Sequence, residues 1–192
     1  MTAWQDFDRV VVAAGRPFAK KEGLVIDPQE RDLQAHRTQS LQNYQPGRQM
    51  QALQKLLQDK TYFITTTIPL HLFQQAGFNK LRLFDKNGDW TAYKCSSGRH
   101  HGVLSYQEAM RHDYHCPVCH SALELNTAWH ANFFPDPDQN ARLRWFLVEA
   151  EDKKTALLFL DDDPQLAPLK SLARQFPNWE AIMAPQDLAT FS

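Results

Sequence analysis

Apolar and polar positions along this chain predict two helices in its N-terminal third. Residues 27–60 are rich in glutamine, and Asp27 followed by Pro28 is a typical helix start. After a break at Pro46-Gly47, apolar residues recur at helical spacing: Met50, Leu53, Leu56 and Leu57. We therefore expect two polar helices in residues 27–60, each with one apolar stripe. Residues 1–26 predict a short helix and then a small strand or arm at 23–26.

The middle of the chain has the pattern of strands. Residues 61–68 are β-branched and aromatic, which favours a strand. Residues 70–76 predict a short helix that ends at Gly77. Residues 80–95 alternate apolar and polar positions around Asn87-Gly88, a dipeptide typical of a tight hairpin turn. We therefore expect a β-hairpin whose second strand ends at Cys95.

The C-terminal part predicts a small β-β-α-β unit. Residues 142–151 and 155–160 have the pattern of two strands around a charged turn, and 180–184 that of a last short strand. Asp163-Pro164 is expected to begin a helix that runs to about Gln175. The prolines at 135 and 137 indicate a linker before this unit.

Composition is that of a globular protein. The chain has 192 residues, of which 43% are hydrophobic and 22% charged, and its net charge is −1. It lacks an apolar run of the roughly 20 residues that a membrane span needs, and its first residues do not resemble a secretory signal. Three cysteines without an export signal favour a reducing compartment, so we expect a cytoplasmic protein with no membrane partner.

All three cysteines lie in one histidine-rich stretch. Cys116 and Cys119 form a Cys-x-x-Cys pair, and Cys95 with His100 or His101 supplies a second pair about twenty residues away. This spacing predicts a structural, tetrahedral Zn²⁺ site, in which His100 and His101 remain alternatives for the fourth ligand. A redox role for Cys-x-x-Cys is disfavoured, because the flanking residues lack the strand and helix of a thioredoxin-type site.

The stretch from Tyr93-Lys-Cys95 through Ser105–Met110 to Cys116–Leu123 resembles the zinc ribbon of archaeal transcription factor E. The resemblance covers about thirty residues, and the first knuckle departs from it by lacking a second cysteine. It implies a winged-helix-like part upstream. The ligand types are also similar to those of a primase ribbon, although the spacing differs.

The predicted fold is α+β, with a helical N-terminal part and hairpin, a central zinc ribbon and the C-terminal β-β-α-β unit. The expected boundaries are an N-terminal α+β region at 1–94, a zinc-ribbon module at 95–126, a linker at 127–141 and a C-terminal α+β unit at 142–192. Both ribbon families implied by the resemblance handle nucleic acid.

The first functional hypothesis is a non-catalytic nucleic-acid-binding protein or a subunit of a nucleoprotein complex, with DNA and RNA both open. Basic residues exceed acidic ones in the N-terminal half, and basic and aromatic side chains gather near the hairpin. The candidate nucleic-acid-binding residues are Lys80, Arg82, Lys86, Trp90, Tyr93, Lys94 and Arg99.

Two further hypotheses remain open. The first is a zinc-stapled module for protein assembly, with the aromatic residues Trp129, Phe133, Phe134 and Trp145 as a docking surface. The second is a Mg²⁺-dependent nuclease that uses Glu149, Glu151 and Lys153. The sequence has no glycine loop for phosphate and no Gly-x-Ser-x-Gly motif, so no catalytic residue is assigned and an enzyme is not indicated.

Overall fold

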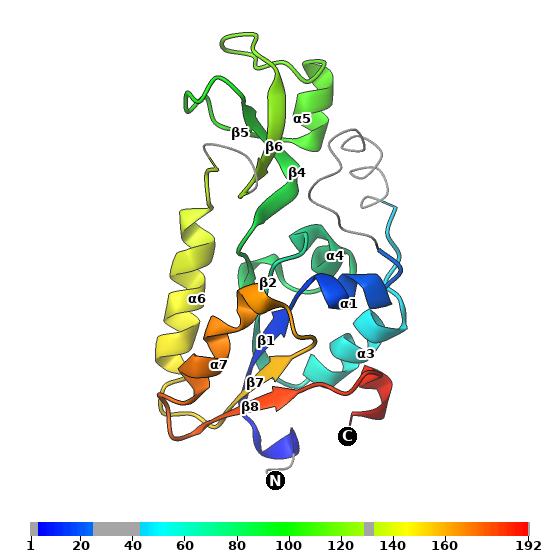
Figure 1. Ribbon diagram of the computed structural model, residues 1–192, viewed down its shortest axis with the longest axis vertical. Coiled ribbons are helices and arrows are strands. Elements are labelled where there is room, and N and C mark those ends of the chain that lie inside the picture. The colour runs from blue at the N-terminus through cyan, green and yellow to red at the C-terminus, as the bar shows by residue number, and fades with distance from the viewer. Residues whose placement is uncertain (1–3, 25–42, 129–132, 192) are drawn as a thin grey trace.

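The computed structural model describes residues 4–24, 43–128 and 133–191 and contains two separate sheets (Figure 1). The larger sheet has five strands in the order β3-β2-β1-β7-β8, and the smaller has three in the order β5-β4-β6. Figure 1 places the smaller sheet at the end of the molecule opposite the two termini.

The five-stranded sheet is parallel throughout and combines strands from both ends of the chain. Its strands are β1 (Arg9–Ala14), β2 (Thr61–Thr66), β3 (Leu83–Asp85), β7 (Thr155–Phe159) and β8 (Trp179–Met183). β1 lies in the centre and pairs with β2 on one side and β7 on the other. The strand order therefore reverses between β1 and β7, and a ligand crevice typically opens at the carboxyl ends of two such strands.

Strand β1 shows why both faces of this sheet are covered. Val10 and Val12 belong to one hydrophobic cluster, whereas Val11 and Ala13 belong to another. Successive side chains of a strand point to opposite faces, so an uninterrupted apolar run is the pattern of a strand that is buried on both sides.

Helices from two parts of the chain cover these two faces. The first cluster contains residues of α1 (Arg16–Lys21), α3 (Arg48–Leu57) and α4 (Leu70–Gln75). The second contains residues of α6 (Pro137–Glu149) and α7 (Pro168–Ala173). In Figure 1 the two groups lie on opposite sides of the sheet. Short 3₁₀ turns at 4–6, 80–82, 164–166 and 188–190 complete the connections.

The three-stranded antiparallel sheet forms a small module between β3 and α6. It consists of β4 (Gly88–Cys95), β5 (Val103–Ser105) and β6 (Leu123–Thr127), and α5 (Tyr106–Arg111) packs beside it. Among the described residues, its hydrophobic cluster has three buried members, Tyr93, Ala109 and Leu125, with Tyr106, Tyr114 and Leu123 packed against them. In α5, Ser105 accepts a hydrogen bond from Glu108 N, and the Glu108 carboxylate accepts one from Ser105 N, so a capping box starts the helix.

The predicted fold class is wrong. Strands from residues 9–85 and from 155–183 share one sheet, so the regions predicted at 1–94 and 142–192 do not form separate cores. Val10–Ala14 was assigned no strand, although five consecutive apolar residues before Gly15 are typical of a buried parallel strand. The first helix predicted in 27–60 and the strand at 23–26 fall largely outside the described residues.

The hairpin predicted at Asn87-Gly88 does not form. β3 pairs with β2 in the large sheet, whereas β4 pairs with β5 and β6 in the small one. The two segments on either side of Asn87-Gly88 therefore enter different sheets. Gly88 has a φ of +89°, which turns the chain from one sheet into the other. Without this hairpin, the expected winged-helix-like part is absent from the described residues.

Residues 142–151 lie largely in helix α6 rather than in a strand. Asp136 accepts hydrogen bonds from the backbone N–H groups of Asp138 and Gln139, and Pro137 occupies the first turn, so this segment starts a helix. Helix α6 includes the last five residues, 137–141, of the linker predicted at 127–141. Other predicted elements are confirmed, namely the helix after Pro46-Gly47 and the segments at 61–68, 70–76, 155–160 and 180–184.

Candidate functional site

Four potential metal ligands meet at the tip of the small sheet. Cys95, His101, Cys116 and Cys119 each offer one ligand atom, and these atoms all lie within 4.8 Å of one another. The sulfurs of Cys95 and Cys119 are 3.3 Å apart, and the Cys116 sulfur is 3.3 Å from His101 Nδ1. A tetrahedral zinc ion with bonds of about 2.3 Å to sulfur places two sulfur ligands roughly 3.8 Å apart. The cluster therefore has the size of a zinc site.

Local backbone geometry holds these ligands. Cys95 is the last residue of β4, where the strand pairing fixes it. Cys116 N–H donates to Ser121 O and His120 N–H donates to Cys116 O, which closes a tight turn around the Cys-x-x-Cys pair. His120 has a φ of +58° at the end of this turn. The turn aims both sulfurs at the end of β4.

The environment favours thiolate at Cys119. Hydrogen bonds from the side chain and backbone of Ser121 lower the pKa of Cys119 to about 5. Burial raises the pKa of Cys95, although hydrogen bonds with Ser97 oppose this effect. Because metals bind thiolate rather than thiol, Cys119 is better prepared than Cys95 to receive an ion at neutral pH.

The two candidate histidines differ in their surroundings. His101 belongs to the four-residue cluster, whereas the His100 ring lies 4.4 Å from the ring of Phe134, measured between centroids. The structure thus brings together three cysteines and His101 and leaves His100 outside the group.

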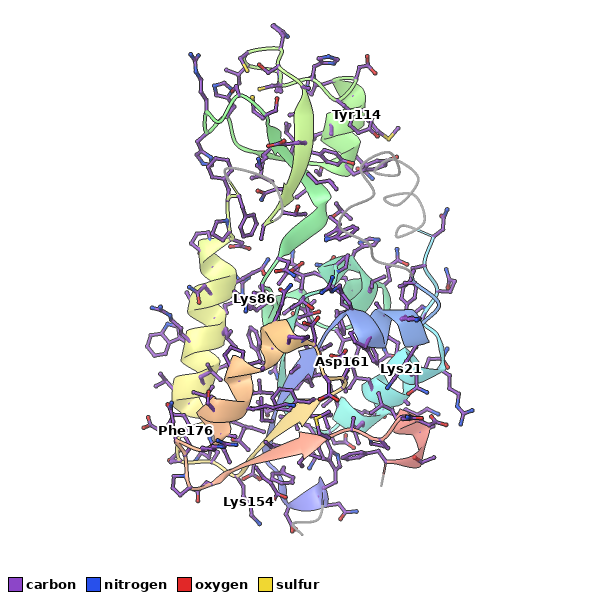
Figure 2. The ribbon with its side chains drawn as sticks, viewed as in Figure 1. Lys21, Lys86, Tyr114, Lys154, Asp161 and Phe176 are labelled. Atoms are coloured by element: carbon purple, nitrogen blue, oxygen red, sulfur yellow. The ribbon has the colours of Figure 1, made fainter. Side chains whose placement is uncertain are left out.

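A second notable cluster lies at the carboxyl edge of the parallel sheet. Asp161 and Asp163 follow β7, and their carboxylates point into the loop between β1 and α1. Figure 2 shows Asp161 beside the start of α1. Asp161 Oδ2 accepts hydrogen bonds from Gly15 N at 2.8 Å and Phe18 N at 3.0 Å.

Asp163 extends the same network. Its Oδ2 accepts hydrogen bonds from Arg16 N at 3.2 Å and from the Thr67 hydroxyl at 2.8 Å, and its Oδ1 accepts one from Gln165 N. Burial favours a raised pKa for Asp163, but these hydrogen bonds outweigh it and lower the pKa. Burial raises the pKa of Asp161, although three backbone N–H groups oppose the change. The sequence favours a helix cap at Asp163 and does not reveal this network, because the residues that donate to the carboxylates from the β1–α1 loop lie far away in sequence.

A pocket of about 590 Å³ separates the small module from the parallel sheet and α6. Ala92 and Val103 contribute from β4 and β5, and Phe133 and Phe134 from the segment before α6. Asn126 holds that segment on β6, because its side chain donates to Phe134 O and accepts from Phe134 N. Asp85, Gln139 and His100 place a few polar groups on the wall. Such a largely apolar cavity with few polar groups is typical of a ligand site.

The residues predicted to bind nucleic acid do not form one surface. Tyr93 and Trp90 are buried in the two different cores, and Lys94 is buried in an ion pair with Glu124. Arg82 lies over the Tyr62 ring, and Lys86 Nζ donates to Gln165 O. Lys80 and Arg99 are exposed, but on different modules. The predicted surface required β3 and β4 to form a hairpin, and these strands belong to different sheets.

The residues predicted for a nuclease lie at the end of α6 and in the turn that follows it. Glu149 ends α6 and forms an ion pair with Arg9, with a nitrogen–oxygen distance of 3.2 Å. Glu151 and Lys153 are exposed in the turn that follows. Neither residue belongs to the metal-ligand group found among the described residues.

No protein-family model and no curated protein matches the chain. Solved structures do match it. A structure determined to explain sirtuin substrate affinity has a TM-score of 0.68 and 14% identity, and the match covers 97% of this chain and 88% of that chain. The chain has a sirtuin-like fold.

Two further sirtuin structures support this assignment of the fold. A Sir2 homologue variant in complex with ADP-ribose has a TM-score of 0.67 and 16% identity, over 97% of this chain and 85% of that one. Sir2 bound to an acetylated peptide has a TM-score of 0.66 and 14% identity, over 97% and 87%. The sirtuin-like match spans the parallel sheet and the metal-ligand module together.

This architecture overturns the predicted functions. The nucleic-acid-binding protein and the zinc-stapled assembly module assumed an appended ribbon, and the Mg²⁺-dependent nuclease assumed a strand at 142–151 that lies largely in helix α6. DNA binding and membership of a nucleoprotein complex have no support in this fold. Among the described residues, no helix combines the length and apolar character that a membrane span requires.

Proposed function

We propose that this protein binds an acylated peptide at the junction between its parallel sheet and its small module. The observation that carries the proposal is the largely apolar 590 Å³ pocket at this junction. An acyl chain on a lysine removes the positive charge and presents methyl and methylene groups, which gain free energy when they leave water for such a pocket.

Known sirtuin structures support the class of ligand. One contains Sir2 with an acetylated peptide, and another contains Sir2 with a propionylated peptide. These structures match 97% of this chain, including both parts that line the pocket. The proposed ligand is therefore a peptide with a short acyl group on lysine.

Strand β5 provides a place for the backbone of such a peptide. It lies at the edge of the small sheet and pairs only with β4 in the observed strand order. Val103, in this strand, also lines the pocket and is 44% exposed. An extended peptide that pairs with an edge strand can direct alternate side chains into a neighbouring pocket.

The ion in this proposal is structural Zn²⁺, held by Cys95, His101, Cys116 and Cys119. Four protein ligands leave no open position for a substrate, so the ion would supply stability rather than chemistry. Its position after the end of β4 and before the start of β5 would fix the strands that border the pocket. The local resemblance to the ribbon of transcription factor E remains a proposal about this module alone.

Some sirtuin structures also contain a dinucleotide or a product of one. One holds a p53 peptide with NAD⁺, and another holds a deacetylated peptide with 2′-O-acetyl-ADP-ribose. In this chain, the amides of Gly15, Arg16 and Phe18 at the sheet crevice already donate to Asp161 and Asp163. The crevice does not fit a pyrophosphate, and the proposed peptide binding uses no dinucleotide.

Fluorescence anisotropy with three otherwise identical peptides tests the proposal. Labelled peptides with acetyl-lysine, propionyl-lysine and unmodified lysine would be titrated with the full-length zinc-loaded protein, without nucleotide. We expect both acylated peptides to bind at least about tenfold more tightly than the unmodified one, a difference of about 1.4 kcal/mol. Equal affinity for all three peptides, or no binding, would refute the proposed function.

A pair of matched variants locates the binding site. Val103 and Val118 are both exposed valines of the small module, but only Val103 lines the pocket. Val103→Lys places a charge beside the acyl group and is expected to abolish the preference for acylated peptides. Val118→Lys is expected to leave it intact. The same effect from both variants would place binding elsewhere.

A further inference from the structure

We propose that the carboxylates of Asp161 and Asp163 close the crevice of the parallel sheet to phosphate groups, so that this protein binds no dinucleotide there. The inference goes beyond peptide binding and does not depend on it. It concerns the point between β1 and β7 where the strand order reverses, which in open α/β sheets is the usual place for a nucleotide.

The hydrogen-bond donors that a phosphate would use are already occupied. In a phosphate-binding loop, the backbone N–H groups at the start of the helix point at the anion. Here those of Gly15 and Phe18 donate to Asp161, and that of Arg16 donates to Asp163. The Thr67 hydroxyl, at the end of the neighbouring strand, also donates to Asp163. Two carboxylates of the chain thus take the role of the bound anion.

The carboxylates are themselves fixed in this position. Asp161 Oδ1 accepts a hydrogen bond from Asp163 N at 2.9 Å, and Asp163 Oδ1 accepts one from Gln165 N at 2.9 Å. Their residues are only 7% and 3% exposed. Every carboxylate oxygen of the pair therefore has a donor within the protein. Displacing them would leave buried charged groups to find new partners, which is costly.

Packing around Gly15 leads to the same conclusion. A β-carbon placed on Gly15 would lie 2.2 Å from Asp163 Cβ and 2.7 Å from Asp161 Oδ1. Glycine in such a loop commonly allows a ligand to approach the backbone closely. At this position the close approach is made by the two aspartates. The space beside the loop is filled from within the chain.

Negative charge on the carboxylates also disfavours the binding of a phosphate group in the crevice. A pyrophosphate carries negative charge, and hydrogen bonds from Gln165, Thr67 and Arg16 favour the ionised form of Asp163. Like charges in a partly buried site repel strongly, because the surrounding protein screens them less than water does. A phosphate would therefore have to displace the carboxylates and also overcome their repulsion.

The test is an NMR titration of the full-length zinc-loaded protein with ADP-ribose, NAD⁺ and inorganic pyrophosphate. In the wild type, the amide signals of Gly15, Arg16 and Phe18 are expected not to shift at ligand concentrations up to about 5 mM. Saturable shifts of these amides within this concentration range would overturn the inference.

Variants then identify the cause. Asp161→Asn with Asp163→Asn keeps the shape of both side chains but removes both charges and one of the two oxygen acceptors at each position, so fewer acceptors compete with a phosphate for the loop N–H groups. We expect this double variant to bind pyrophosphate at least about tenfold more tightly than the wild type. Asp162→Asn is the control, because Asp162 is exposed and its carboxylate pairs with Lys170 rather than with the loop.

Each outcome of the variant experiment decides the question. Equal pyrophosphate affinity in the double variant and the wild type would contradict the role of the carboxylates. If the double variant does not fold, the titration of the wild-type protein still shows whether the crevice binds these phosphate ligands. Failure of the acyl-peptide measurement would leave this result unchanged, since that measurement contains no nucleotide and concerns a different pocket.

Discussion

Two adjacent histidines at the tip of the small sheet have different roles, one as a candidate metal ligand and the other as a packing residue. His101 Nδ1 faces the Cys116 sulfur, whereas the His100 ring packs against Phe134 beside the pocket. The two residues have the same chemistry and nearly the same place in the sequence. Only the direction of each side chain distinguishes them.

Replacing these histidines one at a time should give different results. His101→Ala removes a ligand and is expected to weaken zinc binding by more than the roughly 10- to 100-fold seen for loss of a residue that merely orients a ligand. His100→Ala should retain full zinc affinity. Competition with a chromogenic chelator measures both, and equal affinities would contradict the assignment of His101.

The lowered pKa of Asp163 predicts how the unfolding free energy depends on pH. Its pKa is lowered in the folded protein, so its ionised form stabilises the fold above the ordinary value of about 3.9, and this contribution is lost as pH falls through the lower folded value. Asp163→Asn should therefore cost about 1–3 kcal/mol of unfolding free energy at pH 7, and the deficit should shrink below about pH 4.

Urea unfolding of wild type and variant at several pH values measures this deficit. The contribution of Asp161 to stability has the opposite sign, because its pKa is raised in the folded protein. Since the Asp163 charge is one cause of that raised pKa, Asp163→Asn also reduces the Asp161 contribution. Asp162→Asn, at the exposed neighbouring position, should stay within about 0.5 kcal/mol of wild type. A deficit that does not change with pH would show that Asp163 acts by packing rather than by charge.

At the scale of elements, the passage from β3 to β4 joins the two sheets. Gly88 begins β4 with a φ of +89°, and a β-carbon there would lie 2.4 Å from Asn126 O in β6. The glycine is thus required both by its backbone conformation and by the close approach of β6. Pairing between β4 and β6, in turn, orients the metal ligands at the far end of both strands.

A comparison of two glycines separates these requirements. Gly102 has a φ of +88°, but a β-carbon there would meet no atom within 4 Å. Gly102→Ala is expected to cost about 1–2 kcal/mol of unfolding free energy from backbone conformation alone. Gly88→Ala should cost about 1–3 kcal/mol more, because it also forces the backbones of β4 and β6 apart. Denaturant unfolding measures both, and equal costs would refute the role of close packing.

For the molecule as a whole, the two modules have cores of very different size. The parallel sheet is enclosed by two large hydrophobic clusters, whereas the buried core of the small module consists of Tyr93, Ala109 and Leu125. So small a core stabilises little by burial alone. We therefore expect much of the stability of this module to come from a metal ion held by the group Cys95, His101, Cys116 and Cys119.

Removal of the metal should consequently affect one module and spare the other. After treatment with a chelator, we expect hydrogen exchange to become fast in β4, β5, α5 and β6 and to remain slow in β1 and β7. Mass spectrometry of peptic fragments makes the comparison, and added Zn²⁺ should restore protection. Loss of protection throughout the chain would show that the two modules unfold together.

The amino-acid sequence by itself predicted a metal-ligand group of Cys95, Cys116, Cys119 and either His100 or His101, and the structure brings the three cysteines together with His101. Cys-x-x-Cys and a cysteine some twenty residues earlier limit the geometry, because a short turn keeps both sulfurs together. The sequence also indicated several local elements, including β2, α4 and β7. These elements can be predicted because they depend on steric contacts and hydrogen bonds between residues that are close together in the sequence.

Tertiary structure decided what the sequence pattern left open. The pairing of β1 with β7 joins residues 9–13 to residues 155–159, and the hydrogen bond from Gly15 to Asp161 spans 146 positions. No local pattern identifies such partners, since an apolar strand can be buried against many others. The sheet, the closed crevice and the pocket between the modules arise only when these distant segments pack together.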